Sequence, residues 1–233
     1  MVRHLIHDSD MFDTEDQLMA AFDLALADSE LWLGLPGRRT FTMEEVEGIH
    51  GCVDRMMVSL PSGVRPARAR SELLRQETCC RIVVALRAKQ PKSVDQLALV
   101  VARSRETVRY WLARMEQEGL VRAVSAQGYV LGPKSSLPDC EIWCFEGKLR
   151  NWKRALYQAT RYRAFAHRSF VVMPEDSVRP AEAQVERFRL ARVGLLALHD
   201  NGRLRVITSP RPQRPRSRVM HTMAKGRVLA RLA

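Results

Sequence analysis

A strand, a helix and a second strand follow one another between residues 141 and 174, and this order constrains the fold more than any other feature of the chain. The run EIWCFEGKL is strand-like, NWKRALYQATRYRAFAH has helical spacing, and SFVVMP is again strand-like. Asn151 stands where it can cap the helix. A strand, a helix and a strand in this order form an α/β unit. We therefore expect an α/β fold.

Two charged residues interrupt the first of these strands. Glu146 and Lys148 are two positions apart, so they lie on the same face of the strand. Gln158 and Tyr162 are four positions apart, so they share a face of the helix. Burying an unpaired charge is costly, so Glu146 and Lys148 need either each other as an internal ion pair or a chemical role.

Residues 70 to 131 follow a different pattern, three helices and then a hairpin. The first helix is expected at 71–88, where apolar residues recur at spacings of three and four. Ser93 and Gln96 form a capping box at the second helix, and Ser104 caps the third, which ends at Gly119. Two short alternating runs follow, with a hairpin tip at Gln127 and Gly128.

The third helix has an apolar face and a polar face. Val108, Leu112 and Met115 fall on one side and are expected to pack on the other two helices, with Trp111 at the border. The polar side chains of its N-terminal half point outward, as they do where a recognition helix enters the major groove. The residues expected to contact DNA here are Ser104, Arg105, Thr107, Arg109, Tyr110, Arg114 and, in the wing, Gln127.

This segment resembles the winged helix-turn-helix domains of MarR-type and related regulators over roughly 65 residues. The resemblance implies a double-stranded DNA partner. Such domains also serve as protein–protein modules, and that alternative stays open.

The residues around the winged helix resemble the PD-(D/E)XK, or restriction-endonuclease-like, nuclease superfamily. The E-x-K motif is Glu146, Gly147 and Lys148, and Gln158 with Tyr162 form a Q-x-x-x-Y on the next helix. Here Gly147 stands where the family usually has a bulky apolar residue. The family also places an Asp on the strand before E-x-K.

The missing Asp is expected before the winged helix. Asp139 is too close to Glu146 to lie on a preceding antiparallel strand, whereas Asp54 lies in the strand-like run CVDRMMVSL, after a turn at Gly48 and Gly51. An amphipathic helix upstream, with Glu15 in its first turn, supplies the family's first helix. The expected fold is thus a restriction-endonuclease-like core, helix, mixed sheet and helix, with an inserted winged helix.

The resemblance implies a catalytic set of Asp54, Glu146, Lys148 and Gln158, with Asp54 and Glu146 as ligands of Mg²⁺ or Mn²⁺. Lys148 would steady the attacking water or the charge on the phosphate. The expected domains are 1–66 and 135–210 for the core, 67–134 for the winged helix and 211–233 for a basic C-terminal tail.

Charge is unevenly distributed along the chain. The formal net charge is +12, yet residues 1–60 hold 4 Lys and Arg against 12 Asp and Glu, whereas residues 203–233 hold 9 Lys and Arg and no acid. A basic middle and tail favour a nucleic-acid partner, with anionic lipid or a solvated surface as alternatives. The segment RPQRPRSR is expected to be extended and able to follow a phosphate backbone, and the last residues to form a short helix that docks on the body or on a second copy in a homodimer.

The remaining features concern the compartment and the rest of the core. The five Cys are odd in number and form no CxxC, which indicates buried free thiols rather than a disulfide framework or zinc site. No apolar run reaches membrane-spanning length and no signal peptide is evident, so no membrane partner and a cytoplasmic location are expected. Residues 179–192 are expected to be a helix, followed by a hairpin with its turn at Asn201 and Gly202.

Two functions of different classes fit these patterns. The first is a metal-dependent deoxyribonuclease whose winged helix selects the site. The second is a non-cleaving transcription regulator built on a nuclease-derived fold. RNA as the substrate of the nuclease-like module stays open.

Overall fold

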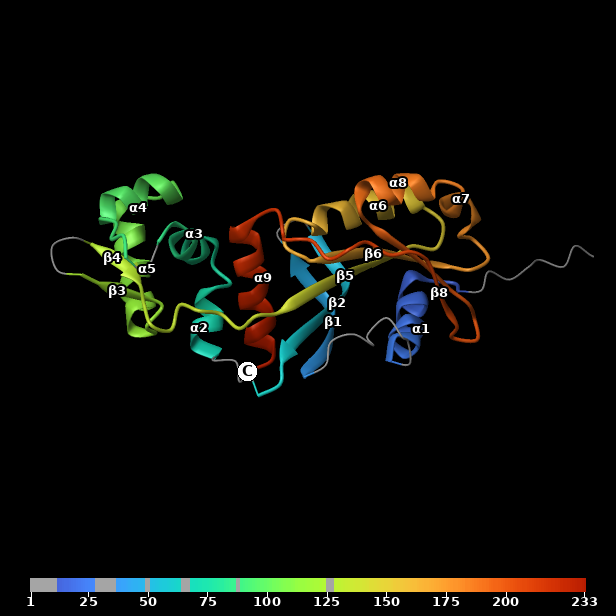
Figure 1. The fold of residues 1–233 in the computed structure, drawn as a ribbon, viewed down its shortest axis with the longest axis horizontal. Coiled ribbons are helices and arrows are strands. Elements are labelled where there is room, and N and C mark those ends of the chain that lie inside the picture. Colours follow the sequence, from blue (N-terminus) through green and yellow to red (C-terminus); the bar gives the residue numbers. More distant parts are fainter. Residues whose placement is uncertain (1–11, 28–36, 49–50, 64–67, 87–88, 125–127) are drawn as a thin grey trace, which may run out of the picture. The chain divides into compact units, whose positions relative to one another are not determined.

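The computed structural model of the chain describes residues 12–27, 37–48, 51–63, 68–86, 89–124 and 128–233 (Figure 1). These residues fall into two compact units. The first contains helix α1 (Glu15–Ala27) together with Phe41–Met57 and Ile142–Arg214. The second contains Gly37–Thr40, Val58–Glu141 and Pro215–Ala233.

Within the described residues, the largest sheet has six strands in the order β1-β2-β5-β6-β7-β8. Strands β5 and β6 are parallel, β6 and β7 are parallel, and β7 and β8 are antiparallel, so the sheet is mixed. The predicted α/β class is therefore confirmed. The strands are β1 (Arg38–Gly48), β2 (Gly51–Pro61), β5 (Glu141–Gly147), β6 (Arg168–Pro174), β7 (Gly194–Leu198) and β8 (Leu204–Thr208).

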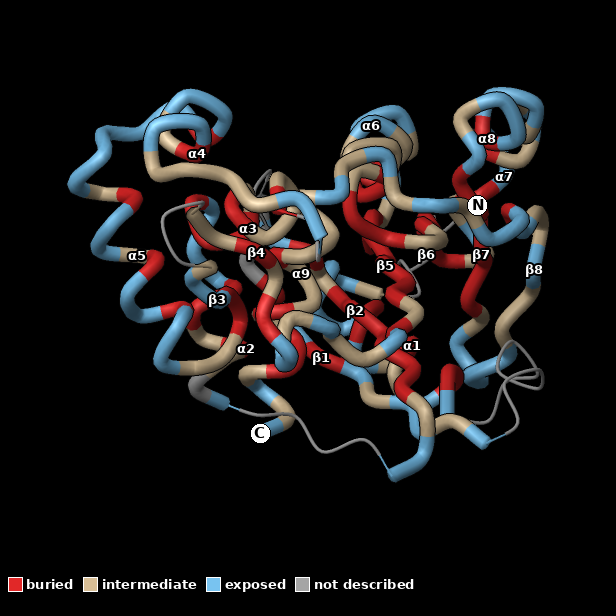
Figure 2. Tube along the Cα trace, turned by 60° about the vertical axis from the view of Figure 1, so that its left-hand side comes forward, coloured by how far each residue is buried: buried red, intermediate tan, exposed pale blue. Residues whose placement is uncertain are grey.

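Helices flank this sheet in the first unit. Helix α1 lies on one face, and α6 (Trp152–Tyr162) and α8 (Val185–Ala191) lie on the other (Figure 1). Phe22 of α1 packs against Phe145 with ring centroids 5.0 Å apart, and Phe145 stacks on Phe170 of β6 at 5.2 Å. Burial is continuous along the central strands β5, β6 and β7 (Figure 2). An aromatic and aliphatic core thus holds α1 against β5 and β6.

Several locally predicted elements of this unit are confirmed. Helix α6 connects the parallel strands β5 and β6, and its cap is Asn151, whose Oδ1 accepts a hydrogen bond of 3.1 Å from the amide of Arg154. The β7–β8 hairpin turns at the predicted position, where Gly202 has a positive φ of 82°. A cap forms where a side chain accepts a hydrogen bond from a free backbone amide, and a tight turn forms where a residue such as glycine tolerates a positive φ.

The second unit contains the predicted order of helices and a hairpin. Ser93 forms the predicted capping box with Gln96, and Ser104 caps the helix that follows it. Val108, Leu112 and Met115 are all buried, as expected. The elements are α2 (Arg68–Leu73), α3 (Glu77–Ala85), α4 (Val94–Val101), α5 (Arg105–Gln117), β3 (Val121–Ala123), β4 (Tyr129–Leu131) and α9 (Arg218–Arg231).

One predicted helix of this unit is wrong. Residues 71–88 were expected to form a single helix, but α2 ends at Leu73 and α3 begins at Glu77, because Gln76 has an extended backbone with ψ of 123°. The break leaves the carbonyl of Leu74 outside a helix, where the thiol of Cys80 donates to it at 3.0 Å. The interruption lets α2 and α3 both pack on α9.

The C-terminal helix α9 belongs to the core of the second unit rather than to a separate tail. Met223 is buried in the same cluster as Leu74, Cys80 and Leu112. Gly226 faces Leu74 so closely that a Cβ there would lie 2.5 Å from the Leu74 carbonyl oxygen. The last residues thus form the expected helix, and its apolar side chains pack it within the second unit.

Three smaller expectations can be compared with the structure, and two of them are wrong. Residues 179–192 form two short helices, α7 (Arg179–Glu182) and α8, because Gln184 leaves the helical conformation with φ of −116°, and this lets Ala181 and Phe188 both be buried. Cys52 is exposed, against expectation, and is the second residue of β2. None of the described helices combines the length and the apolar character needed to cross a bilayer.

Candidate active site

Two acidic residues from different parts of the chain meet at the end of β5. Asp54 lies on β2 and Glu146 on β5, and these strands are neighbours in the sheet. Oδ2 of Asp54 accepts a 2.8 Å hydrogen bond from the amide of Gly147, the residue after Glu146. The carboxylates are close enough that the charge of Asp54 raises the pKa of Glu146. The structure therefore brings together the predicted pair.

Glu146 is fully buried, and its two oxygens have different surroundings. The hydroxyl of Tyr162 on α6 makes a very short hydrogen bond to Oε2. Oε1 lies 3.1 Å from Nζ of Lys148 but accepts no hydrogen bond within the described residues. Burial is the main reason why the pKa of Glu146 is raised, followed by the charge of Asp54; the Tyr162 hydroxyl and Lys148 offset part of the rise.

The tyrosine hydroxyl has two oxygens within reach and one proton to donate. It lies 3.2 Å from the carbonyl of Cys52 as well as against Glu146. With one proton, the hydroxyl donates fully to one of these oxygens at a time, and its shorter contact is the one to Oε2 of Glu146.

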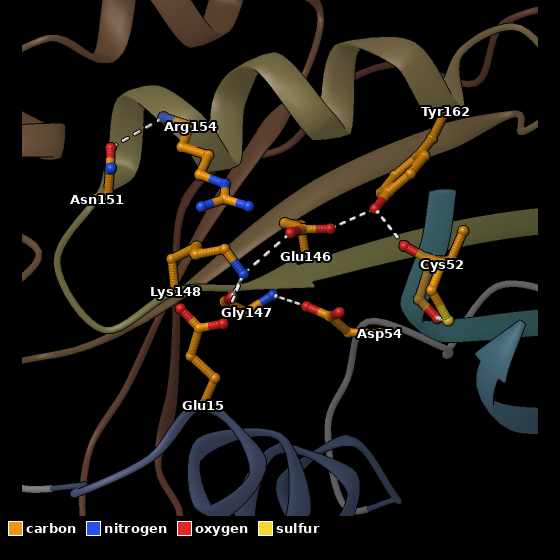
Figure 3. A network of polar contacts seen from close by, with 10 residues as sticks. Glu15, Cys52, Asp54, Glu146, Gly147, Lys148, Asn151, Arg154 and Tyr162 are labelled. Atoms are coloured by element: carbon orange, nitrogen blue, oxygen red, sulfur yellow. Dashed lines mark hydrogen bonds and ion pairs between the residues drawn. The ribbon is translucent and has the colours of Figure 1, made fainter. Parts of the chain in front are cut away.

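Lys148 is held by three oxygens. Its ammonium lies 2.7 Å from Oε2 of Glu15, 2.8 Å from the carbonyl of Gly147 and 3.1 Å from Oε1 of Glu146. Burial lowers the pKa of Lys148, but the hydrogen bond to Glu15 and the charges of Glu146 and Asp54 together outweigh burial and raise it. Lys148 is therefore a fixed cation beside the two carboxylates (Figure 3).

Gly147 has a packing reason to be glycine. A Cβ at this position would lie 2.7 Å from Cγ of Met19, so α1 could not pack as closely on β5 if the residue had a side chain. The close approach places Glu15, in the first turn of α1, next to Lys148 (Figure 3). Sequence order alone pointed to Glu15, and the structure shows its contact.

Helix α6 contributes the opposite side of the cluster. Gln158 lies on the same face as Tyr162, and its Oε1 is buried without a hydrogen-bond partner in the described chain. The side chain of Arg154 extends from α6 toward Glu146 and Lys148 (Figure 3). Sequence reasoning missed Arg154, although the four-residue spacing of 154, 158 and 162 places it on the same face as the Q-x-x-x-Y residues.

Burial also raises the pKa of Asp54, an effect that the Gly147 amide and Lys148 partly offset. Burial opposes the ionisation of both carboxyls, and the charge of Asp54 opposes that of Glu146 further, so a divalent cation would stabilise their charged forms. Mg²⁺ is commonly held by one or two carboxylates, with water and substrate phosphate as further ligands. The residues fit such an ion, although no group of three or more His, Cys, Asp and Glu side chains able to hold a metal occurs among the described residues.

The residues predicted to contact DNA lie on α5 in the second unit. Ser104 and Thr107 are engaged in the helix cap, 2.9 Å apart. Arg105 is exposed and forms an ion pair of 2.6 Å with Asp95 of α4. Arg109 is exposed, and Gln127 lies outside the described residues.

The two aromatic residues of α5, the exposed Tyr110 and the partly buried Trp111, cluster with Arg114. Arg114 donates a 2.9 Å hydrogen bond to the hydroxyl of Tyr110, and its guanidinium lies over the rings of Tyr110 and Trp111 at 5.7 and 5.6 Å. Tyr110 is 55% exposed. Asp139, which the sequence excluded from the acidic pair, is exposed and pairs with Arg38 at 3.3 Å.

Comparison of the chain with protein-family models, curated proteins and solved structures gave no match. The function is therefore inferred from the geometry of the described residues.

Proposed function

We propose that the protein is a metal-dependent deoxyribonuclease with a PD-(D/E)XK-like core and a winged helix-turn-helix that binds duplex DNA. The single observation that carries the proposal is the hydrogen bond between the Gly147 amide and Asp54, because it joins the acid of β2 to the E-x-K of β5. Further support comes from the order of elements, α1, β1, β2, β5, α6 and β6, with β5 and β6 parallel.

Each residue of the cluster has a chemical role in this proposal. Asp54 and Glu146 would hold Mg²⁺ or Mn²⁺, which when bound lowers the pKa of its water and stabilises the leaving oxygen. Lys148 places a positive charge where charge accumulates on a phosphate in the transition state. Tyr162 donates to Oε2 of Glu146 and so keeps that oxygen in place, while Oε1 lies 3.1 Å from the ammonium of Lys148.

The second unit supports the DNA-binding half of the proposal. Helices α3, α4 and α5 are followed by the β3–β4 hairpin, and Lys92 before α4 bridges to Tyr129 of β4. This is the element order of a winged helix, in which the third helix enters the major groove. Arg109 and Tyr110 are exposed there.

Plasmid cleavage by the full-length protein tests the proposal. Mg²⁺ or Mn²⁺ should support scission, EDTA should stop it, and Asp54→Asn, Glu146→Gln and Lys148→Met should each abolish it while DNA binding persists. Asp139→Asn is the matched control, because it removes an exposed acid that pairs with Arg38 away from the cluster. Scission that survives Asp54→Asn and Glu146→Gln would overturn the assignment.

One observation favours a second function. Lys148 already has three oxygen neighbours within the protein, so the cluster includes a complete internal ion-pair network without any metal. In a regulator, this network would only stabilise the fold, and the protein would bind DNA through α5 without cleaving it. Specific duplex binding without scission under either metal, with Lys148→Met lowering stability only, would select this alternative.

A further inference from the structure

A pocket of about 480 Å³ opens in the first unit between the end of α8 and the segment after β8. Three arginines line it: Arg189 and Arg192 from α8 and its cap, and Arg211 from the C-terminal segment. Thr208 and Ser209 add hydroxyl groups. No acidic residue belongs to this lining as far as the chain is described. The pocket is therefore rich in hydrogen-bond donors and positively charged.

The C-terminal wall of the pocket is fixed in place. The amide of Gln213 donates to the carbonyl of His167 at 3.0 Å. Oε1 of Gln213 accepts a 2.8 Å hydrogen bond from Arg163, whose other terminal nitrogen donates to the carbonyl of Ala191 at 2.7 Å. Arg163 thus ties the end of α8 to the segment that carries Arg211. The backbone that carries Arg192 and Arg211 is thereby fixed, which favours binding because only their side chains need ordering.

Arg192 has an unusual backbone for its residue type. It caps α8 in the left-handed conformation, with φ of 55° and ψ of 43°, where glycine is the residue that avoids steric strain. Its guanidinium lies 3.5 Å from Oε1 of Gln213. Among the described residues neither Arg192 nor Arg211 has a carboxylate partner, whereas Arg189 pairs with Glu186. An arginine in the left-handed conformation that lines a pocket and has no carboxylate partner among the described residues can offer its charge to an anion.

We propose that this pocket binds phosphate groups of a nucleic-acid strand. Guanidinium forks and hydroxyl donors together match the oxygens of a phosphodiester. The choice of a nucleic acid over a free nucleotide rests on the proposed function and on the charge of the chain, since residues 203–233 contain nine basic residues and no acid. The pocket would then hold the backbone of the DNA strand independently of the carboxylate cluster.

Two substitutions separate binding from folding. Arg192→Gly removes the charge and also removes the left-handed strain, so its melting temperature should equal or exceed that of the wild type while its DNA affinity falls. Arg211→Gln removes the second unpaired charge. Arg203→Gln, exposed on the β7–β8 hairpin, is the control with the same loss of charge outside the pocket.

The measurement is the affinity of the full-length protein for a duplex in EDTA across a range of salt concentrations. The slope of log affinity against log salt should fall by about 1 for each arginine removed from the pocket, because each phosphate contact releases about 0.9 counterion. An unchanged slope in Arg192→Gly with Arg211→Gln would overturn the proposal, and so would an equal fall in Arg203→Gln. A lower melting temperature for Arg192→Gly with unchanged affinity would assign Arg192 to the helix end alone.

A second arm identifies the source of the phosphate. If ATP binding depends on Arg192 and Arg211 while duplex binding does not, the ligand is a free nucleotide and the nucleic-acid assignment is wrong. Failure of the nuclease proposal would show differently, as missing metal-dependent scission with the salt slopes still dependent on these arginines. Metal-dependent scission together with salt slopes that do not change when Arg192 and Arg211 are substituted would support the nuclease proposal and overturn phosphate binding by the pocket.

Discussion

The amide of Gly147 donates a 2.8 Å hydrogen bond to Oδ2 of Asp54, although the two residues are 93 positions apart. This bond places the carboxylate of β2 beside Glu146 and Lys148 at the end of β5. Every member of the cluster belongs to the first unit, since Glu15 comes from α1 and Tyr162 from α6.

Tyr162→Phe should lower the free energy of unfolding by about 1–3 kcal/mol, the range for leaving a buried polar group without its partner. The substitution removes the hydroxyl that donates to Glu146 and so also raises the pKa of that carboxyl further. Urea denaturation at neutral pH measures the effect. Tyr157→Phe on the same helix is the control, because Tyr157 is 64% exposed, and it should change stability by less than about 0.5 kcal/mol.

Glu146→Gln should flatten the pH dependence of stability in the metal-free protein. Folding raises the pKa of Asp54 and Glu146 above their ordinary values of 3.8 and 4.5. The folded state therefore binds protons that the unfolded chain has released, and these carboxyls favour folding fully below those values. Their contribution is lost as the pH rises through the folded pKa.

Urea melts in EDTA at several pH values from about 4.5 upward measure this loss, which should be smaller in Glu146→Gln than in the wild type. Lys148 does not interfere, because its raised pKa places its own loss of stabilisation above 10.5. Saturating Mg²⁺ should reverse the trend in the wild type alone. Parallel curves for both proteins would show that Glu146 ionises normally.

Gly147→Ala should destabilise the protein by about 1–3 kcal/mol, the range for overpacking a dense core. The added methyl group meets Cγ of Met19 at 2.7 Å, so the buried Met19 side chain, or α1 with it, has to shift. The same change in a Met19→Ala background should be milder, because the obstacle is gone. A double-mutant cycle in chemical denaturation gives the coupling, and additive effects would mean that the two residues do not meet.

Gly226→Ala should destabilise the second unit, although alanine is the better helix former by about 1 kcal/mol. The new Cβ would meet the main-chain carbonyl of Leu74 at 2.5 Å, and a main-chain group cannot swing aside as a side chain can. Thermal melts followed by circular dichroism measure the change. A raised melting temperature would show that α9 does not pack on α2.

Arg109→Ala should weaken binding to a specific duplex by about 1–3 kcal/mol, the cost of losing a base contact in the major groove. Arg105→Ala should weaken it less, since Arg105 is engaged with Asp95 and must break that ion pair to reach a base. Mobility-shift titrations compare the two variants. Arg81→Ala on α3, a half-buried arginine paired with Glu77, is the control. Unchanged affinity in both α5 variants would exclude this helix as the reader.

The amino-acid sequence determined the elements whose signals are local. The caps at Ser93, Ser104 and Asn151 and the turn at Gly202 lie where the residue types predicted them, because a cap or turn satisfies backbone groups within a few positions. The pairing of Glu146 with Lys148 on one face likewise follows from strand periodicity.

Only the tertiary structure decided the contacts between distant segments. Three features depend on which surfaces pack together in the folded chain. They are the hydrogen bond between Asp54 and Gly147, the contact of Glu15 with Lys148, and the end of α2 at Leu73. Residue periodicity carries no information on that choice. Packing decides it, and glycines at 147 and 226 are the residues where α1 and α9 approach too closely to leave room for a side chain.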